Sequence, residues 1–215
     1  MFRYVPIFGS QIAFRDYKLN LGISGSVWVG FKHFADFLTG TQFGVLMKNT
    51  LALSFYNIGA SFLPPILLAL ALNYAFNRHF GKTVQMVTYA PHFLSTVVVC
   101  SMITLFCNKD SGLFNNIAEA LGGQRTAFLE KANLFTPIYV WSGVWQGIGW
   151  SSILYIAALS GVSPELVEAA RIDGANRLQI VLHVNIPAIM PTIVITLIMS
   201  CGGILSVGFE KVYLL

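Results

Sequence analysis

The chain has 215 residues, of which 55% are hydrophobic and 10% are charged. Soluble domains carry about 25% charged residues, so this composition excludes most classes of soluble protein and indicates a membrane protein. The formal net charge of +4 is too small and too scattered for a nucleic-acid-binding surface, so we expect no nucleic acid partner.

Residues 1–47 form the least hydrophobic part of the chain. The apolar run at the start is too short for a signal peptide, and no targeting segment is predicted. Residues 28–34, from Trp28 to Phe34, predict a short amphipathic segment, an interfacial aromatic anchor, or both at once. We expect residues 1–45 to precede a transmembrane core at 46–215.

Four long stretches lack Asp, Glu, Lys and Arg, and each exceeds the roughly 20 residues that a transmembrane helix needs. They predict helices surrounded by membrane lipid near residues 46–75, 84–107, 136–160 and 187–209. A soluble helical core is the alternative, but four uninterrupted apolar segments would be unusual in one.

Prolines and polar residues subdivide the first half of this core. Pro64 and Pro65 predict a hinge in the middle of the first span, and Pro91 predicts a kink at the start of the second. The polar loop at residues 110–131 has room for a short helix around residues 113–121.

The third and fourth spans carry aromatic and glycine features. Three tryptophans in the third span lie broadly on one face and, taken alone, indicate helix packing or an interfacial belt more than a ligand site. These are Trp141, Trp145 and Trp150. In the fourth span, Gly202 and Gly203 allow a break or close helix contact. Glu210 is interpreted as a solvated cap paired with Lys211, with a pore-mouth carboxylate as the alternative.

The cysteines indicate neither a metal site nor a disulfide framework. The three cysteines lie inside apolar segments and form neither a metal-binding spacing nor an even-numbered disulfide framework. We interpret Cys100, Cys107 and Cys201 as buried small hydrophobes and expect no metal.

Residues 161–186 form the long polar break in the apolar second half. Ser163 predicts an N-cap, Pro164 suits the first helical position, and Gly174 can adopt the left-handed turn that ends a helix. A second short helix is expected at residues 177–184. The segment therefore predicts two short helices joined by a turn.

The spacing in this loop resembles a known motif. Glu168-Ala169-Ala170 is followed by three residues and Gly174, and nine further residues lead to Val184, Asn185, Ile186 and Pro187. Membrane subunits of bacterial binding-protein-dependent ABC importers carry Glu-Ala-Ala, three residues, Gly, nine residues, Ile, any residue, Leu-Pro. Val184 and Ile186 depart from that pattern but stay aliphatic. Asp173-Gly174-Ala175 resembles the carbohydrate, maltose-type branch.

This resemblance implies an all-α fold: a polytopic transmembrane helical bundle of the type I ABC importer permease kind. The loop would be the helix that couples a cytoplasmic ATPase to the membrane helices. The implied coupling residues are Glu168, Ala169, Ala170, Asp173, Gly174 and Pro187. The implied substrate contacts are Gly143, Gln146, Gly147, Trp150, Ser200, Phe209, His92 and Thr96. An aromatic face suits the C–H face of a sugar, and amide and hydroxyl groups suit its hydroxyls.

The function that the resemblance implies is sugar or oligosaccharide import by alternating access, in a bacterial inner or plasma membrane. No catalysis and no cofactor are expected, because the chain lacks a Gly-x-x-x-x-Gly-Lys-Ser/Thr phosphate loop and ATP would bind a partner subunit. Expected partners are the ATP-binding subunit, a second permease subunit and an extracytoplasmic solute-binding protein. An importer subunit for peptides or amino acids, and a non-transporting membrane scaffold or sensor, remain alternatives.

Two expectations concern topology and length. With the coupling loop in the cytoplasm, four basic residues lie on the inner side and nine on the outer side. This distribution opposes the positive-inside rule, but we assign the orientation from the motif. Residues 1–45 would then be extracytoplasmic. Relatives usually have further transmembrane helices before and after this region, so the chain is expected to be a fragment lacking terminal helices.

Overall fold

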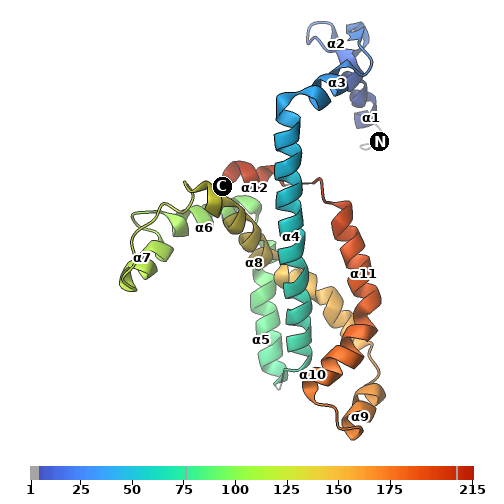
Figure 1. Ribbon diagram of the computed structural model, residues 1–215, viewed down its shortest axis with the longest axis vertical. Helices are drawn as coiled ribbons and strands as arrows, with labels where there is room; N and C mark the ends of the chain where they lie inside the picture. The colour runs from blue at the N-terminus through green and yellow to red at the C-terminus, as the bar shows by residue number, and fades with distance from the viewer. Residues whose placement is uncertain (1–4, 76, 207) are drawn as a thin grey trace. The chain divides into compact units, whose positions relative to one another are not determined.

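The computed structural model describes residues 5–75, 77–206 and 208–215 (Figure 1). The chain divides into two units, residues 1–50 and residues 51–215, and each is described by itself. The first four residues, which belong to the predicted extracytoplasmic segment and where no signal peptide is predicted, lie outside the described residues. Val207, within the predicted fourth span, also lies outside them.

The first unit holds short helices and one pair of two-residue strands. Its elements are α1 (Val5–Gly9), the 3-10 helix η1 (Ser10–Phe14), β1 (Arg15–Asp16), α2 (Gly22–Gly25), β2 (Val27–Trp28), α3 (Lys32–Thr39) and the start of α4 (Thr41–Asn73). The strands pair antiparallel, with Arg15 opposite Trp28. Strands this short leave no alternating pattern in a sequence, which is why none was predicted.

The aromatic segment at residues 28–34 belongs to three elements instead of one. Trp28 ends β2 and stacks on Phe14 with ring centroids 5.4 Å apart. Gly30 turns the chain with a positive φ of 59°, and α3 begins only at Lys32. Only the last three residues of the predicted amphipathic segment, from Lys32 to Phe34, are helical, and they form the first turn of α3.

The second unit is helical in its described residues, which confirms the all-α prediction. It contains the rest of α4, α5 (Arg78–Tyr89), the 3-10 helix η2 (Ala90–Phe93), α6 (Thr96–Cys107), α7 (Leu113–Ala120) and α8 (Ala132–Ser160). It continues with α9 (Pro164–Ile172), α10 (Arg177–Ile180), the π-helix η3 (Val181–Asn185), α11 (Ile186–Gly202) and α12 (Phe209–Leu214).

Two helices in the described ranges are long and apolar enough to cross a membrane: α4, and the continuous helix at residues 177–202. Two further pairs meet the same test only as bent units, so the total reaches four if each bent pair is one span. The pair formed by residues 132–160 and 164–172 bends by 72°.

The other bent pair departs from the predicted second span. Residues 79–93 and 96–107 meet at 101°, a sharper bend than a kink at Pro91. Pro91 lies in η2, Leu94 then adopts an extended backbone, and the Ser95 side chain accepts a hydrogen bond from Val98 N to cap a new helix. A 3-10 turn followed by a fresh N-cap therefore redirects the chain.

The first and last spans also differ from expectation. α4 runs through Pro64 and Pro65 as one helix of 33 residues. α11 ends at Gly202, before the predicted limit at residue 209, and the backbone N–H of Gly203 closes it by donating to the carbonyls of Ser200 and Cys201. The chain then forms α12, which packs against α6.

The core of the second unit lies where α4, α8 and α11 meet. Its buried side chains are Ile66, Ala69, Leu70, Tyr155, Leu159 and Ile189. The Tyr155 hydroxyl lies 2.8 Å from Thr196 Oγ1 and joins α8 to α11. α5 packs closely on α8 at Gly149, where a Cβ would meet the backbone of Thr88 and lie 2.8 Å from Tyr89 N.

Two smaller predictions have different outcomes. The helix expected around residues 113–121 is confirmed as α7, held by Asn115, which is buried and bonds to the backbone of Asn108 and Thr126. Cys100 and Cys107 are buried, but Cys201 is exposed, so its interpretation as buried was wrong. The apolar sequence around Cys201 predicted that other residues of the chain would cover this side chain. No described residue covers the face of α11 that carries it.

Candidate functional site

Two adjoining hollows of about 370 and 310 Å³ lie along α8 and share Ser61, Pro65 and Ser151. We call them together the cavity. Its wall comes from α4 (Asn57, Ser61, Phe62, Pro65), α8 (Tyr139, Gly143, Val144, Gln146, Gly147, Ile148, Trp150, Ser151, Leu154, Tyr155), α11 (Thr196, Met199, Ser200) and α12 (Lys211). Residues 139 to 155 of α8 extend about 24 Å, so the cavity is elongated.

The wall combines aromatic faces with neutral hydrogen-bonding groups. Hydroxyls come from Ser61, Ser151, Thr196 and Ser200, and an amide comes from Asn57. Pro64 and Pro65 add to this set indirectly: neither carries an N–H, so the carbonyls of the residues four positions earlier lose their helical partner. One of those carbonyls belongs to Ser61, at the junction of the two hollows.

Five of the predicted substrate residues line the cavity, and Gly143 is one of them. Gln146 and Gly147 lie in one hollow, and Trp150 and Ser200 lie in the other. The Gln146 amide nitrogen donates to the Leu94 carbonyl at 3.0 Å, which leaves its oxygen to accept a hydrogen bond. Among the described residues outside its own helical turn, no atom lies within 4 Å of the position of a Cβ on Gly147, so the glycine leaves the cavity open there.

His92 reaches the site through Trp150. The two rings stack with centroids 4.5 Å apart and an interplanar angle of 4°, and Phe93 lies edge-on to the same indole. The bend after η2 therefore supplies one side of the aromatic surface. Thr96, in the first turn of α6, is outside the cavity lining, and Phe209 is exposed and stacks on Tyr213.

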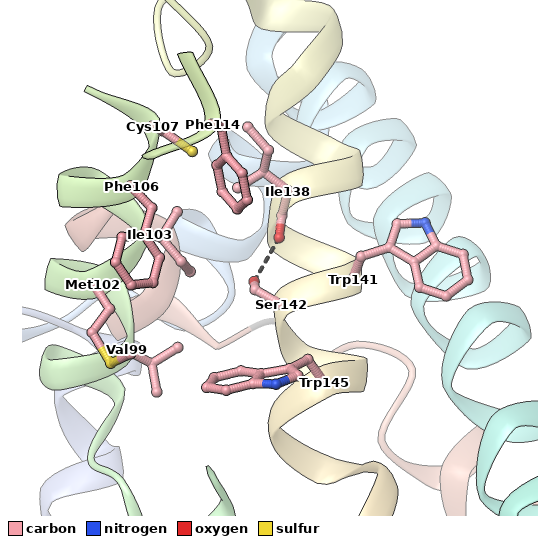
Figure 2. Close-up of a pocket in the computed structure, with 10 residues that line it drawn as sticks. All are labelled: Val99, Met102, Ile103, Phe106, Cys107, Phe114, Ile138, Trp141, Ser142 and Trp145. Atoms are coloured by element: carbon pink, nitrogen blue, oxygen red, sulfur yellow. Dashed lines mark hydrogen bonds between the residues drawn. The ribbon is translucent and has the colours of Figure 1, made fainter. Parts of the chain in front are cut away.

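The three tryptophans of α8 do not share one face, which corrects the sequence interpretation. Figure 2 shows Trp141 and Trp145 beside a separate apolar pocket of about 420 Å³ between α6, α7 and α8. Trp141 points away from its centre, and its indole N–H donates to the Tyr56 hydroxyl on α4. A helix turns about 100° per residue, so nine positions place Trp150 on the side opposite Trp141.

Lys211 is a cavity residue that sequence reasoning missed. Its ammonium donates to the Tyr139 carbonyl at 2.7 Å and lies 4.8 Å from the centre of the Tyr139 ring. The predicted pair with Glu210 is absent from the described contacts, and Glu210 is exposed. Burial lowers the pKa of Lys211, an effect that nearby Cys100 partly opposes. Adjacent opposite charges suggested a surface pair, but consecutive residues of a helix do not face each other.

The predicted coupling loop forms two capped helical segments, α9 and the start of the helix at α10. We call residues 163–187 the knuckle. The Ser163 side chain accepts a hydrogen bond from Glu165 N, and Pro164 occupies the first helical position, as predicted. Gly174 has a φ of 82°, which confirms the left-handed turn. Around it, Ala175 N donates to Ala170 O and Gly174 N donates to Arg171 O, the pattern of a Schellman motif.

The residues predicted to couple to an ATPase lie on the knuckle surface. Glu168, Ala169 and Asp173 are exposed, and Ala170 is half-buried. Three large apolar side chains are also uncovered: Leu166 at 57%, Ile172 at 86% and Leu178 at 66% exposure. Small residues beside exposed apolar ones form a surface that suits close contact with another protein.

The second short helix predicted at residues 177–184 is helical but not separate. α10, η3 and α11 form one helix at residues 177–202, which starts with a capping box between Asn176 and Gln179. Pro187, exposed in the first turn of α11, has no N–H for the His183 carbonyl, and a π-turn occurs at that point. The knuckle is therefore joined directly to the helix that carries Thr196 and Ser200.

Asn185 is a second residue that sequence reasoning missed. It occupies the motif position that accepts any residue, yet it is 1% exposed and its amide donates to the Tyr74 hydroxyl at 2.9 Å. This bond ties the base of α11 to the chain just after α4. No pattern in the sequence signalled it, because it joins residues that are distant along the chain.

Comparisons with known proteins agree with this architecture. The polygalacturonan/rhamnogalacturonan transport system permease protein YteP of Bacillus subtilis is 46% identical over 215 residues, covering 100% of this chain and 67% of that protein. A bacterial ABC transporter involved in the import of the acidic polysaccharide alginate matches with a TM-score of 0.91 and 38% identity, over 100% of this chain and 72% of that one. A bacterial alginate ABC transporter in complex with an alginate pentasaccharide-bound periplasmic protein gives a TM-score of 0.90 at 38% identity, over 71% of its chain.

A family model, described as the inner membrane component of binding-protein-dependent transport systems, matches residues 44–207. That range holds the knuckle and the whole cavity wall except Lys211. It is also well over half of the chain. The chain therefore belongs to the family of inner membrane components of binding-protein-dependent transport systems.

Proposed function

We propose that this chain forms part of the membrane pathway of an ATP-driven importer for saccharides and works by alternating access. The observation that supports this most directly is the elongated cavity along α8, which is lined by aromatic and, apart from Lys211, neutral hydrogen-bonding groups and is joined by one helix to the exposed knuckle. The printed names of the relatives, which refer to polygalacturonan and alginate, support the same substrate class.

The chemistry of the wall favours a saccharide over an amino acid or a peptide. Sugar rings present C–H faces that stack on indole, and Trp150 offers such a face beside His92. Sugar hydroxyls both donate and accept, which suits the amide oxygen of Gln146 and the hydroxyl of Ser200. An amino acid would need a paired anion and cation site, and no Asp or Glu lines the described cavity.

The continuous helix explains how an event at the knuckle reaches the cavity. Residues 177 to 200 span about 35 Å, and a packed helix moves largely as a unit. A partner that closes around Leu166, Ile172 and Leu178 would displace the helix that carries Thr196 and Ser200. We propose an ATPase subunit as that partner, with the knuckle in the cytoplasm and residues 1–45 on the outer side.

The remaining partners follow from the same function. A second permease subunit would complete the pathway, and an extracytoplasmic binding protein would deliver the saccharide, as in the alginate complex. ATP would bind and be hydrolysed in the ATPase subunit. This chain itself would perform no chemical conversion and hold no cofactor.

The test compares two tryptophans of α8 in the complete transporter. Trp150 and Trp145 are 48% and 47% exposed, but only Trp150 lines the cavity. Trp150→Ala should raise the KM for saccharide uptake into proteoliposomes about tenfold, because stacking on an aromatic ring contributes about 1 kcal/mol or more. Trp145→Ala should leave that KM unchanged, and Gln146→Ala should raise it by a smaller factor.

Equal KM values for the Trp150→Ala and Trp145→Ala transporters would contradict the assigned cavity. Uptake of a peptide or an amino acid in place of every saccharide tested would favour the importer of another substrate class. Basal ATP hydrolysis with no uptake of any solute would favour a scaffold or sensor.

A further inference from the structure

The ammonium of Lys211 is the one cation in the described lining of the cavity. It lies against α8 beside Gly143, where a Cβ would be only 3.3 Å from Nζ. The hydrogen bond to the Tyr139 carbonyl holds it there, and the absence of a side chain at Gly143 leaves room for it. A glycine and a main-chain acceptor thus place a positive charge at one end of the cavity.

This charge has no anionic partner among the described residues. The other polar groups of the lining are neutral, and no carboxylate forms an ion pair with Lys211. An ammonium has three N–H donors, and the Tyr139 carbonyl accepts from one of them. A half-buried cation with unused donors is costly unless an anion or water supplies the missing partners.

We propose that Lys211 determines specificity by binding a carboxylate of the transported saccharide, so that the substrate contains uronic-acid residues. This inference rests on the function proposed above. One ammonium balances the single negative charge of one carboxylate and forms charge-assisted hydrogen bonds with it. A neutral sugar at the same place would leave the cation unpaired.

The position of Lys211 also sets a minimum size for the substrate. The ammonium lies beside Gly143, and Trp150 with its stacking face lies seven positions further along α8, about 10 Å away on the helix axis. A single sugar ring cannot reach both. The charged contact and the stacking contact therefore act on different units of one oligosaccharide.

The test measures uptake of trigalacturonate and of its methyl ester, which differ in the charge of their carboxyl groups. The complete transporter in proteoliposomes is compared with Lys211→Met, Lys211→Arg and, as a control, Lys109→Met, an exposed lysine outside the cavity. The readout is the ratio of the KM for the ester to the KM for the acid. All variants use the same binding protein, so its own preference contributes equally to every ratio.

Lys211→Met should raise the KM for trigalacturonate at least about tenfold and leave the KM for the ester nearly unchanged, because only the acid loses a charge-assisted bond. Lys211→Arg should keep the preference for the acid, and Lys109→Met should match the unaltered transporter. Lys211→Gln, which can still donate to the Tyr139 carbonyl, takes the place of Lys211→Met if the latter fails to assemble.

Three results would overturn the inference. An equal rise in both KM values in Lys211→Met or Lys211→Gln would mean that Lys211 only tethers α12 to α8. An equal loss of preference in Lys109→Met would assign the effect to overall charge. Uptake of neutral oligosaccharides without uptake of the acid would remove the inference and leave the proposed function intact, whereas uptake of no saccharide at all would remove both.

Discussion

Between Ser163 and Gln179 the knuckle holds its shape through bonds between near neighbours in the sequence, whereas the cavity takes its wall from residues between Asn57 and Lys211. Ser163 caps the residue two positions later, Asn176 and Gln179 cap each other, and Ala175 bonds back to Ala170. In the cavity, by contrast, Lys211 bonds to Tyr139, and Gln146 bonds to Leu94.

Because of this difference, the knuckle and the cavity should respond differently when helices elsewhere in the molecule move. A locally capped segment keeps its form when distant parts of the molecule move, which suits a part that must transmit motion. A wall assembled from distant segments changes its shape when any helix shifts, which suits a pathway that must open and close. Substitutions should therefore cost most where helices from distant positions meet, and least where the chain bonds to its own neighbours.

The largest effect is expected at Gly149, where α5 and α8 touch through backbone. Gly149→Ala places a methyl group onto the Thr88 carbonyl, and main chain cannot give way as a flexible side chain can. The loss should be about 3 kcal/mol of the free energy of unfolding. Thermal unfolding of the purified complex in detergent measures it.

Gly147→Ala is the matched control for this substitution. Gly147 lies two positions away on the same helix and has nothing within 4 Å of its built Cβ. A melting temperature for Gly149→Ala equal to that of Gly147→Ala would show that contact between distant helices does not govern stability here.

An intermediate effect is expected at the bond between Asn185 and Tyr74. Asn185→Ala leaves the Tyr74 hydroxyl without this partner and removes a buried amide, at a cost of about 1–2 kcal/mol. Together with Tyr74→Phe and the double variant it forms a thermodynamic cycle, measured by thermal unfolding. The coupling energy should be about 1 kcal/mol. Strictly additive losses would mean that the two side chains do not depend on each other.

The smallest effect on stability is expected inside the knuckle, at Gly174. Its built Cβ meets nothing within 4 Å, so Gly174→Ala costs only the left-handed backbone, about 1 kcal/mol. The angle of the turn should nevertheless relax and lower the stimulation of ATP hydrolysis by substrate. Assays of stimulated against basal hydrolysis in the complete transporter measure this effect.

Gly161→Ala, at the end of α8, serves as the control for that turn. Gly161 has a φ of −86°, which any residue adopts, and its Cβ would make an ordinary contact with Ala158 O at 3.4 Å. If both variants retained full stimulation, the left-handed turn would not be needed for coupling.

The same contrast explains which features the sequence could predict. The caps at Ser163 and Gly174 and the helix at residues 113–121 depend on residues a few positions apart, and the motif from Glu168 to Pro187 is one continuous stretch of sequence, so the sequence displays all of them directly. The helical class follows from apolar runs longer than a bilayer crossing.

Features that depend on contacts between distant residues could not be predicted from the sequence. The 101° bend after η2 requires the continuation at Leu94 and Ser95, and Pro91 alone signals only a kink. Lys211 was assigned to its neighbour Glu210, because nothing in the sequence brings Tyr139 beside it. Trp141 and Trp150 are nine positions apart, and the rotations along that stretch of helix add up to about 180°, so the two side chains lie on opposite sides of α8.

The π-turn at residues 181–185 has a consequence for rotational phase. A π-turn holds one residue more than an α-turn, so everything after it is rotated by about 100° relative to an unbroken helix. Residues 177–180 and residues 186–202 therefore lie on one helix axis, but their side chains are not in the rotational register of an unbroken α-helix. The π-turn therefore sets the angle between the face of residues 177–180 and the face of α11 that carries Thr196 and Ser200 into the cavity.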